Sequence, residues 1–115
     1  MPVDPQSFAK AWIAAWNARD LEAVLSHYEE DIVFLSPVAE RVTGNGRILG
    51  LEALRTYWRR ALEGIANLHF DLQAVLTGAD CLTILYRNQR GQQVAETVEF
   101  NPAGKVVRSF ACYGD

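Results

Sequence analysis

The stretch QQVAETVEFNPAGKVVRSFACY, residues 92–113, decides the fold of this chain. Apolar residues alternate on both sides of the turn residues Asn101–Gly104, which predicts two antiparallel strands joined by a short turn. Glu96 lies in the same row as Val98 and Phe100, because alternate side chains of a strand point to the same face. The pattern therefore places one carboxyl group in an apolar row.

The length of the turn predicts that Glu96 faces Ser109 on the neighbouring strand. The residues expected on the face of Glu96 are Val107, Ala111 and Tyr113. Those expected on the other face are Val106, Arg108, Phe110 and Cys112. A shift of one residue in the pairing would instead bring Arg108 or Phe110 opposite Glu96.

Both faces of this last strand are largely apolar, and a chain of 115 residues has helices for only one of them. The apolar side chains on the other face must therefore be buried by another molecule. We therefore expect a homodimer that forms through the sheet, on the face of Val106, Phe110 and Cys112.

The rest of the chain predicts three helices and further strands. Helical spacing of apolar residues indicates helices over residues 5–18, 21–28 and 51–65, and Asp4 and Asp20 are suited to cap the first two. Runs of β-branched and aromatic residues indicate the strands. The strands are expected over residues 31–36, 68–76, 81–88, 92–100 and 105–113, with a short strand and a loop within residues 38–50. Successive hairpins with helices on one face predict a single α+β domain over residues 1–115.

Composition excludes several classes of function. Eleven basic and fourteen acidic residues give a net charge of −3, without the positive stripe that nucleic-acid binding requires. No apolar run approaches the length of a membrane span and no signal peptide is visible, so we expect no membrane contact and a cytoplasmic location. Because His, Cys and carboxylate residues are not clustered and no phosphate-binding loop is present, we expect neither a metal nor a cofactor.

Three motifs resemble the NTF2-like superfamily, and most closely its SnoaL-like and ketosteroid-isomerase-like branch. They are WNARDLEAVLSHYEEDIVFLSP, GLEALRTYW and FNPAGKVVRSFACYGD, which cover residues 16–37, 50–58 and 100–115. The resemblance implies an NTF2-like (cystatin-like) cone, with three N-terminal helices packed on a strongly curved, mostly antiparallel sheet. It also implies a mostly apolar pocket between helices and sheet, in a protein that is often dimeric.

The resemblance also implies positions for functional groups. The tyrosine that donates to the oxyanion in the isomerase looks to correspond to Trp12, the general-base aspartate to Ser36, and the second oxyanion donor to Glu96. Serine cannot take a proton from carbon unaided, and an indole offers a single N–H donor. Steroid isomerisation by the standard mechanism is therefore not expected.

The implied pocket has aromatic walls and a few polar points. The walls are Trp12, Trp16, Phe34, Trp58 and Tyr113, and the polar points are Ser36, Ser109 and Glu96. For Trp16, plain core packing is the favoured interpretation. Glu96 either pairs with an arginine or lies at a wet strand end, or it lines a ligand cavity.

Two hypotheses for the function follow. In the first, the chain is a SnoaL-like protein that binds a small apolar molecule, and Glu96 serves as the acid–base group of an isomerase, lyase or hydrolase acting on a hydrophobic ring compound. In the second, it is a non-catalytic dimeric binding or accessory domain. An open cavity with an unpaired Glu96 favours the first hypothesis, and a filled core with Glu96 paired to an arginine favours the second.

Overall fold

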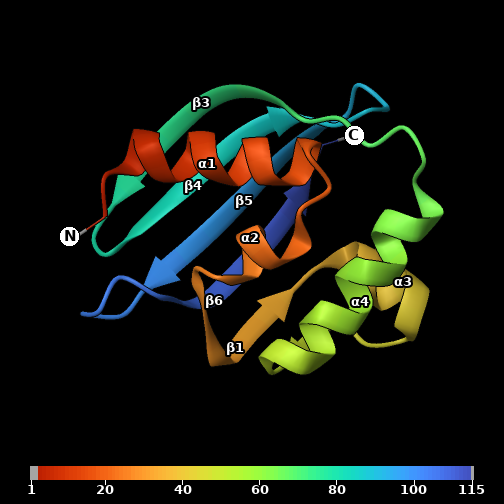
Figure 1. Cartoon of the computed structure of the whole chain (residues 1–115), viewed down its shortest axis with the longest axis horizontal. Helices are drawn as coiled ribbons and strands as arrows, with labels where there is room; N and C mark the ends of the chain where they lie inside the picture. The colour runs from red at the N-terminus through yellow and green to blue at the C-terminus, as the bar shows by residue number, and fades with distance from the viewer. Residues whose placement is uncertain (1–2, 115) are drawn as a thin grey trace.

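The computed structural model describes residues 3–114. Met1, Pro2 and Asp115, which the predicted domain includes, lie outside the described residues. Figure 1 shows helices packed on one face of a bent sheet. In chain order the elements are α1 (Pro5–Asn17), α2 (Leu21–Leu25), β1 (Tyr28–Leu35), α3 (Pro37–Thr43), β2 (Arg47–Leu49), α4 (Leu51–Gly64), β3 (Asp71–Gly78), β4 (Cys81–Arg87), β5 (Gln93–Phe100) and β6 (Val106–Tyr113).

The first two helices begin where their capping residues predict. The side chain of Asp4 accepts a hydrogen bond from the Ser7 amide at 2.9 Å, and that of Asp20 accepts one from the Ala23 amide at 3.1 Å. Each carboxylate satisfies an amide that has no partner within its helix. The predicted end of the second helix was wrong, because α2 stops at Leu25 and Tyr28 already begins β1.

Residues 37–43 form a helix, α3, where the sequence predicted a strand or loop. Ser36 begins it, because its Oγ accepts hydrogen bonds from the amides of Val38 at 3.1 Å and Ala39 at 3.4 Å. Pro37 suits the first turn of a helix. Gly44, with a φ of 83°, ends α3 in the left-handed conformation that glycine adopts without strain. The predicted short strand exists, as β2.

The six strands lie in the order β2-β1-β6-β5-β4-β3. Strands β1 and β6 run parallel and the other neighbours run antiparallel, as expected for a mostly antiparallel sheet. The pairing is interrupted in β3 between Leu72 and Ala74, and in β6 at Val107, which has no partner between the pairs Glu99–Arg108 and Phe100–Val106. Such bulges bend a sheet locally. Helix α1 packs on β3 and helix α4 on β1, so the helices cover the concave face.

The register of the last hairpin differs from both predicted alternatives. Glu96 lies opposite Ala111, and Ser109 lies opposite Val98. The interruption near Phe100 turns Val106 to the helix-covered face, where it is fully buried. The prediction that Val106 lies on the outer face and Val107 beside Glu96 was therefore wrong.

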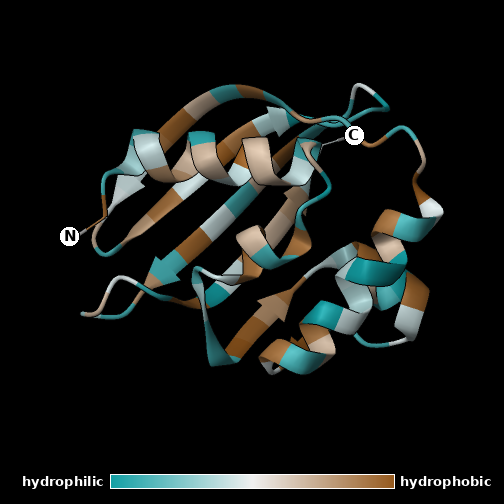
Figure 2. Cartoon of the chain, viewed as in Figure 1, coloured by the Kyte–Doolittle hydropathy of each residue, from teal (hydrophilic) through white to brown (hydrophobic). Residues whose placement is uncertain are grey.

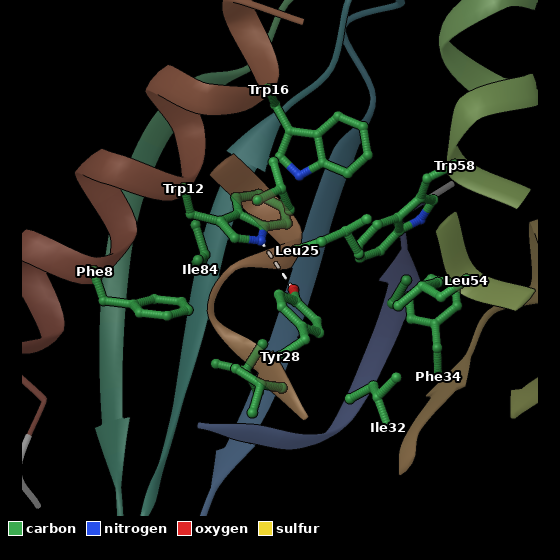
Figure 3. Close-up of a cluster of buried hydrophobic side chains, with 14 of the residues drawn as sticks. Phe8, Trp12, Trp16, Leu25, Tyr28, Ile32, Phe34, Leu54, Trp58 and Ile84 are labelled. Atoms are coloured by element: carbon green, nitrogen blue, oxygen red, sulfur yellow. Dashed lines mark hydrogen bonds between the residues drawn. The ribbon is translucent and has the colours of Figure 1, made fainter. Parts of the chain in front are cut away.

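Aromatic side chains fill the space between helices and sheet. In Figure 2 apolar and polar residues alternate along the strands, and Figure 3 shows the apolar side chains that meet beneath α1 and α4. Trp12, which is 1% exposed, donates from Nε1 to the hydroxyl of Tyr28 at 3.1 Å. This hydrogen bond joins α1 to the start of β1.

Among residues 3–114, none of the helices is both long and apolar enough to cross a membrane.

Replacing Tyr28 with phenylalanine should destabilise the fold, because the buried N–H of Trp12 loses its acceptor. We expect Tyr28→Phe to lower the free energy of unfolding by about 1–3 kcal/mol in urea denaturation. Tyr57→Phe, which removes a hydroxyl from a half-buried side chain, is the matched control and should cost less. Equal stability of Tyr28→Phe and the wild type would show that the hydrogen bond contributes nothing net.

Candidate functional site

A cavity of about 250 Å³ lies between the helices and the concave face of the sheet. Its walls come from α1, β1, α3, α4, β4, β5 and β6, together with residues 65–70 and the β4–β5 turn, residues 88–92. All the site residues predicted from the sequence line it except Ser109, which is fully buried next to Glu96. The lining residues among them are Trp12, Trp16, Phe34, Ser36, Trp58, Glu96 and Tyr113.

The three tryptophans of the chain all contribute to the wall. Trp12 and Trp16 lie one turn apart on α1, and the ring of Trp58 on α4 meets that of Trp16 edge to face at a centroid distance of 5.0 Å (Figure 3). Trp16 is 5% exposed, so it packs in the core and lines the cavity at once. Because the N–H of Trp12 already donates to Tyr28, it is not free to take the oxyanion-donor role that the resemblance implies.

Ser36 lies where β1 ends and α3 begins. It is 4% exposed and its Oγ caps α3, so this position serves the local fold as well as the cavity wall. A serine hydroxyl used in this way cannot act as a general base for carbon.

Glu96 reaches into the cavity from the middle of β5. Its carboxyl group is buried, with 3% of the residue exposed, and it accepts a hydrogen bond from the Ser109 hydroxyl. No basic side chain among residues 3–114 lies within 4 Å of this carboxyl group. Of the alternatives for Glu96, the structure thus has a carboxyl group that lines a cavity, rather than one paired with arginine.

Burial raises the pKa of Glu96 to about 8, and the hydrogen bond from Ser109 opposes part of that rise. The rise has a simple cause, since an apolar environment disfavours the charged form of an acid. Glu96 is therefore mostly a neutral carboxylic acid at pH 7. In that form it can donate a proton as well as accept a hydrogen bond.

The four tyrosines of the chain all lie within electrostatic reach of this carboxyl group. Burial raises the pKa of Tyr28, Tyr57, Tyr86 and Tyr113, and the charge of Glu96 raises each of them further. For Tyr113 the pKa reaches about 12. All four phenols are therefore protonated near neutral pH, and Tyr57, Tyr86 and Tyr113 bring hydroxyl groups to the cavity wall.

Several lining residues were not predicted from the sequence. They are Tyr57, Phe70, Tyr86, Arg41 and the turn of residues 88–92, among others. Arg41 was missed because the helix that carries it, α3, was expected to be strand or loop. Tyr86 could have been found, since alternation along β4 puts it in the same buried row as Ile84.

Within the described part of the chain, no group of three or more His, Cys, Asp or Glu side chains is placed to hold a metal ion.

The family model for the SnoaL-like domain matches residues 9–112, nearly the whole chain. The chain belongs to the SnoaL-like family. A SnoaL-like protein of unknown function from Burkholderia thailandensis has 41% sequence identity and a TM-score of 0.94, over 96% of this chain and 94% of that one. None of the functionally curated proteins matches the chain.

Two further solved structures share the fold at low sequence identity. TerC, co-crystallised with polyporic acid, has a TM-score of 0.78 at 16% identity, over 96% of this chain and 92% of TerC. A protein from Shewanella denitrificans proposed to be a SnoaL-like polyketide cyclase has a TM-score of 0.74 at 17% identity, over 99% of this chain and 92% of that one. Solved structures of an NTF2-like protein and of a protein with a cystatin-like fold match the chain as well, which establishes the NTF2-like (cystatin-like) fold of this SnoaL-like protein.

The raised pKa of Glu96 should make stability depend on pH. Between the ordinary carboxyl pKa of about 4.5 and the raised pKa of about 8, the folded protein keeps a proton that the unfolded chain releases, so stability falls as pH rises and levels off above that range. We expect this group to contribute a slope of about 1.4 kcal/mol per pH unit.

Urea denaturation from pH 5 to 9 measures this slope, and Glu96→Gln, which is neutral at every pH, should remove it. The control is Glu99→Gln on the same strand, whose side chain lies on the outer face near Arg108. Identical pH profiles for the wild type and Glu96→Gln would contradict a neutral Glu96.

Proposed function

We propose that this SnoaL-like protein binds a hydrophobic ring compound in the cavity and that Glu96 acts there as a proton donor. The observation that carries this proposal is a buried, unpaired carboxylic acid at the wall of an aromatic cavity. Three of the lining side chains, Trp16, Phe34 and Trp58, are aromatic and give the wall an apolar character suited to a ring. The fold shared with TerC supports the use of this architecture for small molecules.

The polar groups of the wall favour chemistry that develops negative charge on an oxygen. Glu96, Tyr57 and Tyr113 are neutral donors at pH 7, and a donor in a dry site stabilises a developing oxyanion. After Glu96 gives its proton to a carbonyl or epoxide oxygen, the hydroxyl of Ser109 remains to stabilise the carboxylate. These groups suit an isomerase, lyase or hydrolase step that begins with protonation of a carbonyl or epoxide oxygen on the ring compound.

Glu96 can be tested by following the conversion of two-ring ketones, epoxides and lactones by liquid chromatography coupled to mass spectrometry, because chromatography separates isomers of equal mass. Positioned general acids contribute about 10²–10⁴-fold to a rate, so Glu96→Gln should lower conversion by that factor while binding is retained. Glu99→Gln on the outer face should behave as the wild type. Binding without conversion by the wild type would favour the non-catalytic alternative, and full conversion by Glu96→Gln would exclude Glu96 as the acid.

We further propose that two copies associate through the outer face of the sheet. Leu85, Ala95 and Phe110 lie on that face and stay partly exposed, and Cys112 is exposed beside them. These residues form an apolar surface that the helices of the same chain do not cover.

Phe110→Glu should convert such a dimer to monomer, because it places a charge in the centre of the apolar face. Light scattering coupled to gel filtration measures the mass of each species. Val42→Glu, on α3 and 69% exposed, is the control and should leave the mass unchanged. A wild-type protein of monomeric mass would reject the dimer.

A further inference from the structure

Two arginines line the same cavity as Glu96. Arg41 comes from α3 and Arg90 from the β4–β5 turn, and Figure 1 places both elements at the same side of the molecule. Both residues are exposed. Within residues 3–114, neither guanidinium has a carboxylate partner within 4 Å. These two charges are thus available to a molecule that enters the cavity.

The cavity has an unusual charge for this chain. Among the described residues that line it, Glu96 is the one acidic side chain, and it is mostly neutral at pH 7. The two arginines therefore give the cavity a net positive charge, although the chain carries a net charge of −3. A cleft lined by one sign of charge concentrates molecules of the opposite sign.

Arg41 also lies near the phenols of the wall. Its positive charge lowers the pKa of Tyr57 and of Tyr113, against the larger effect of burial. This places the guanidinium within electrostatic reach of two hydroxyl donors. A guanidinium beside phenol hydroxyls is a donor arrangement suited to an anionic oxygen group, since guanidinium binds carboxylate through two parallel hydrogen bonds.

We propose that the ligand of this cavity is a ring compound with an anionic oxygen group, typified by a carboxylate, which lies against Arg41 and Arg90 while the ring lies against Trp16 and Trp58. The proposal rests on the proposed function, because it requires that the cavity binds a ring compound. It adds the polarity of that compound and its orientation. The anionic end lies at the exposed arginines and the ring extends toward the buried Glu96.

Two probes of nearly the same shape test the proposal. Binding of 2-naphthoate and of its neutral analogue 2-naphthamide is measured by titration calorimetry at pH 7 and low salt. We expect 2-naphthoate to bind about tenfold more tightly, because its carboxylate gains charge-assisted hydrogen bonds. Added salt should reduce this preference, since it screens exposed charges.

The variants Arg41→Gln, Arg90→Gln and the double variant assign the preference to these side chains. The double variant should bind both probes equally. Arg59→Gln removes the same charge from an exposed position on α4 outside the cavity wall, and it should keep the full preference. Circular dichroism of each variant establishes that it is folded.

The outcomes separate this inference from the function on which it rests. Equal binding of both probes by the wild type, or an unchanged preference in the double variant, would overturn the proposal of an anionic ligand. The cavity would then remain a binding site for neutral rings. Failure of both probes to bind would reject both proposals.

Discussion

The burial of Glu96 is the constraint on which the rest of this structure depends. An ionised carboxylate in an apolar interior costs several kcal/mol, so the group must be neutral, paired or hydrated. Here it receives one hydrogen bond from Ser109, lies between Ile84 and Ala111 on the neighbouring strands, and faces a cavity with aromatic walls. Its neutral state follows from that environment.

The same environment sets the behaviour of the neighbouring phenols. Because the charged form of Glu96 would raise the pKa of all four tyrosines, the carboxyl group and the phenols favour a common protonated state. The wall therefore presents proton donors on its inner side and the guanidinium groups of Arg41 and Arg90 on its outer side. A ligand with oxygen acceptors at both of its ends can bind the inner proton donors and the outer guanidinium groups, and the aromatic walls suit a flat ring between them.

Much of this arrangement could be predicted from local pattern. The row of apolar residues drew attention to Glu96, and helical spacing placed Trp12, Trp16 and Trp58 on the apolar faces of their helices, while the shared pocket was implied by the family resemblance. The register of β5 and β6 could not be predicted, because the turn is one residue longer than Asn101–Gly104 and the bulge at Val107 shifts the pairing by one more residue. Helix α3 was missed because Gly44-Asn45-Gly46 indicates a turn and Pro37 was interpreted only as the end of a strand, although Ser36-Pro37 is also a helix start.

The functional positions implied by the family resemblance were likewise limited by contacts that the sequence does not reveal. Glu96 lies at the cavity wall and its functional role stays a prediction, whereas Trp12 and Ser36 have structural partners that no sequence pattern reveals. The indole N–H of Trp12 donates to the hydroxyl of Tyr28, which lies 16 positions away in the chain. Arg41 and Arg90 are far apart in the sequence, since α4 and the three strands β2, β3 and β4 separate α3 from the β4–β5 turn, and only the fold brings them to one cavity.

The measurement that tests the central claim most directly is the pKa of Glu96 itself. Carboxyl-carbon NMR of labelled protein, with Glu96→Gln to assign the signal, follows its titration between pH 3 and 10. A midpoint near 8 would establish a neutral, desolvated acid at the cavity wall. A midpoint at or below the ordinary value of about 4.3 would mean a hydrated or ion-paired carboxylate, and would contradict its role as a proton donor.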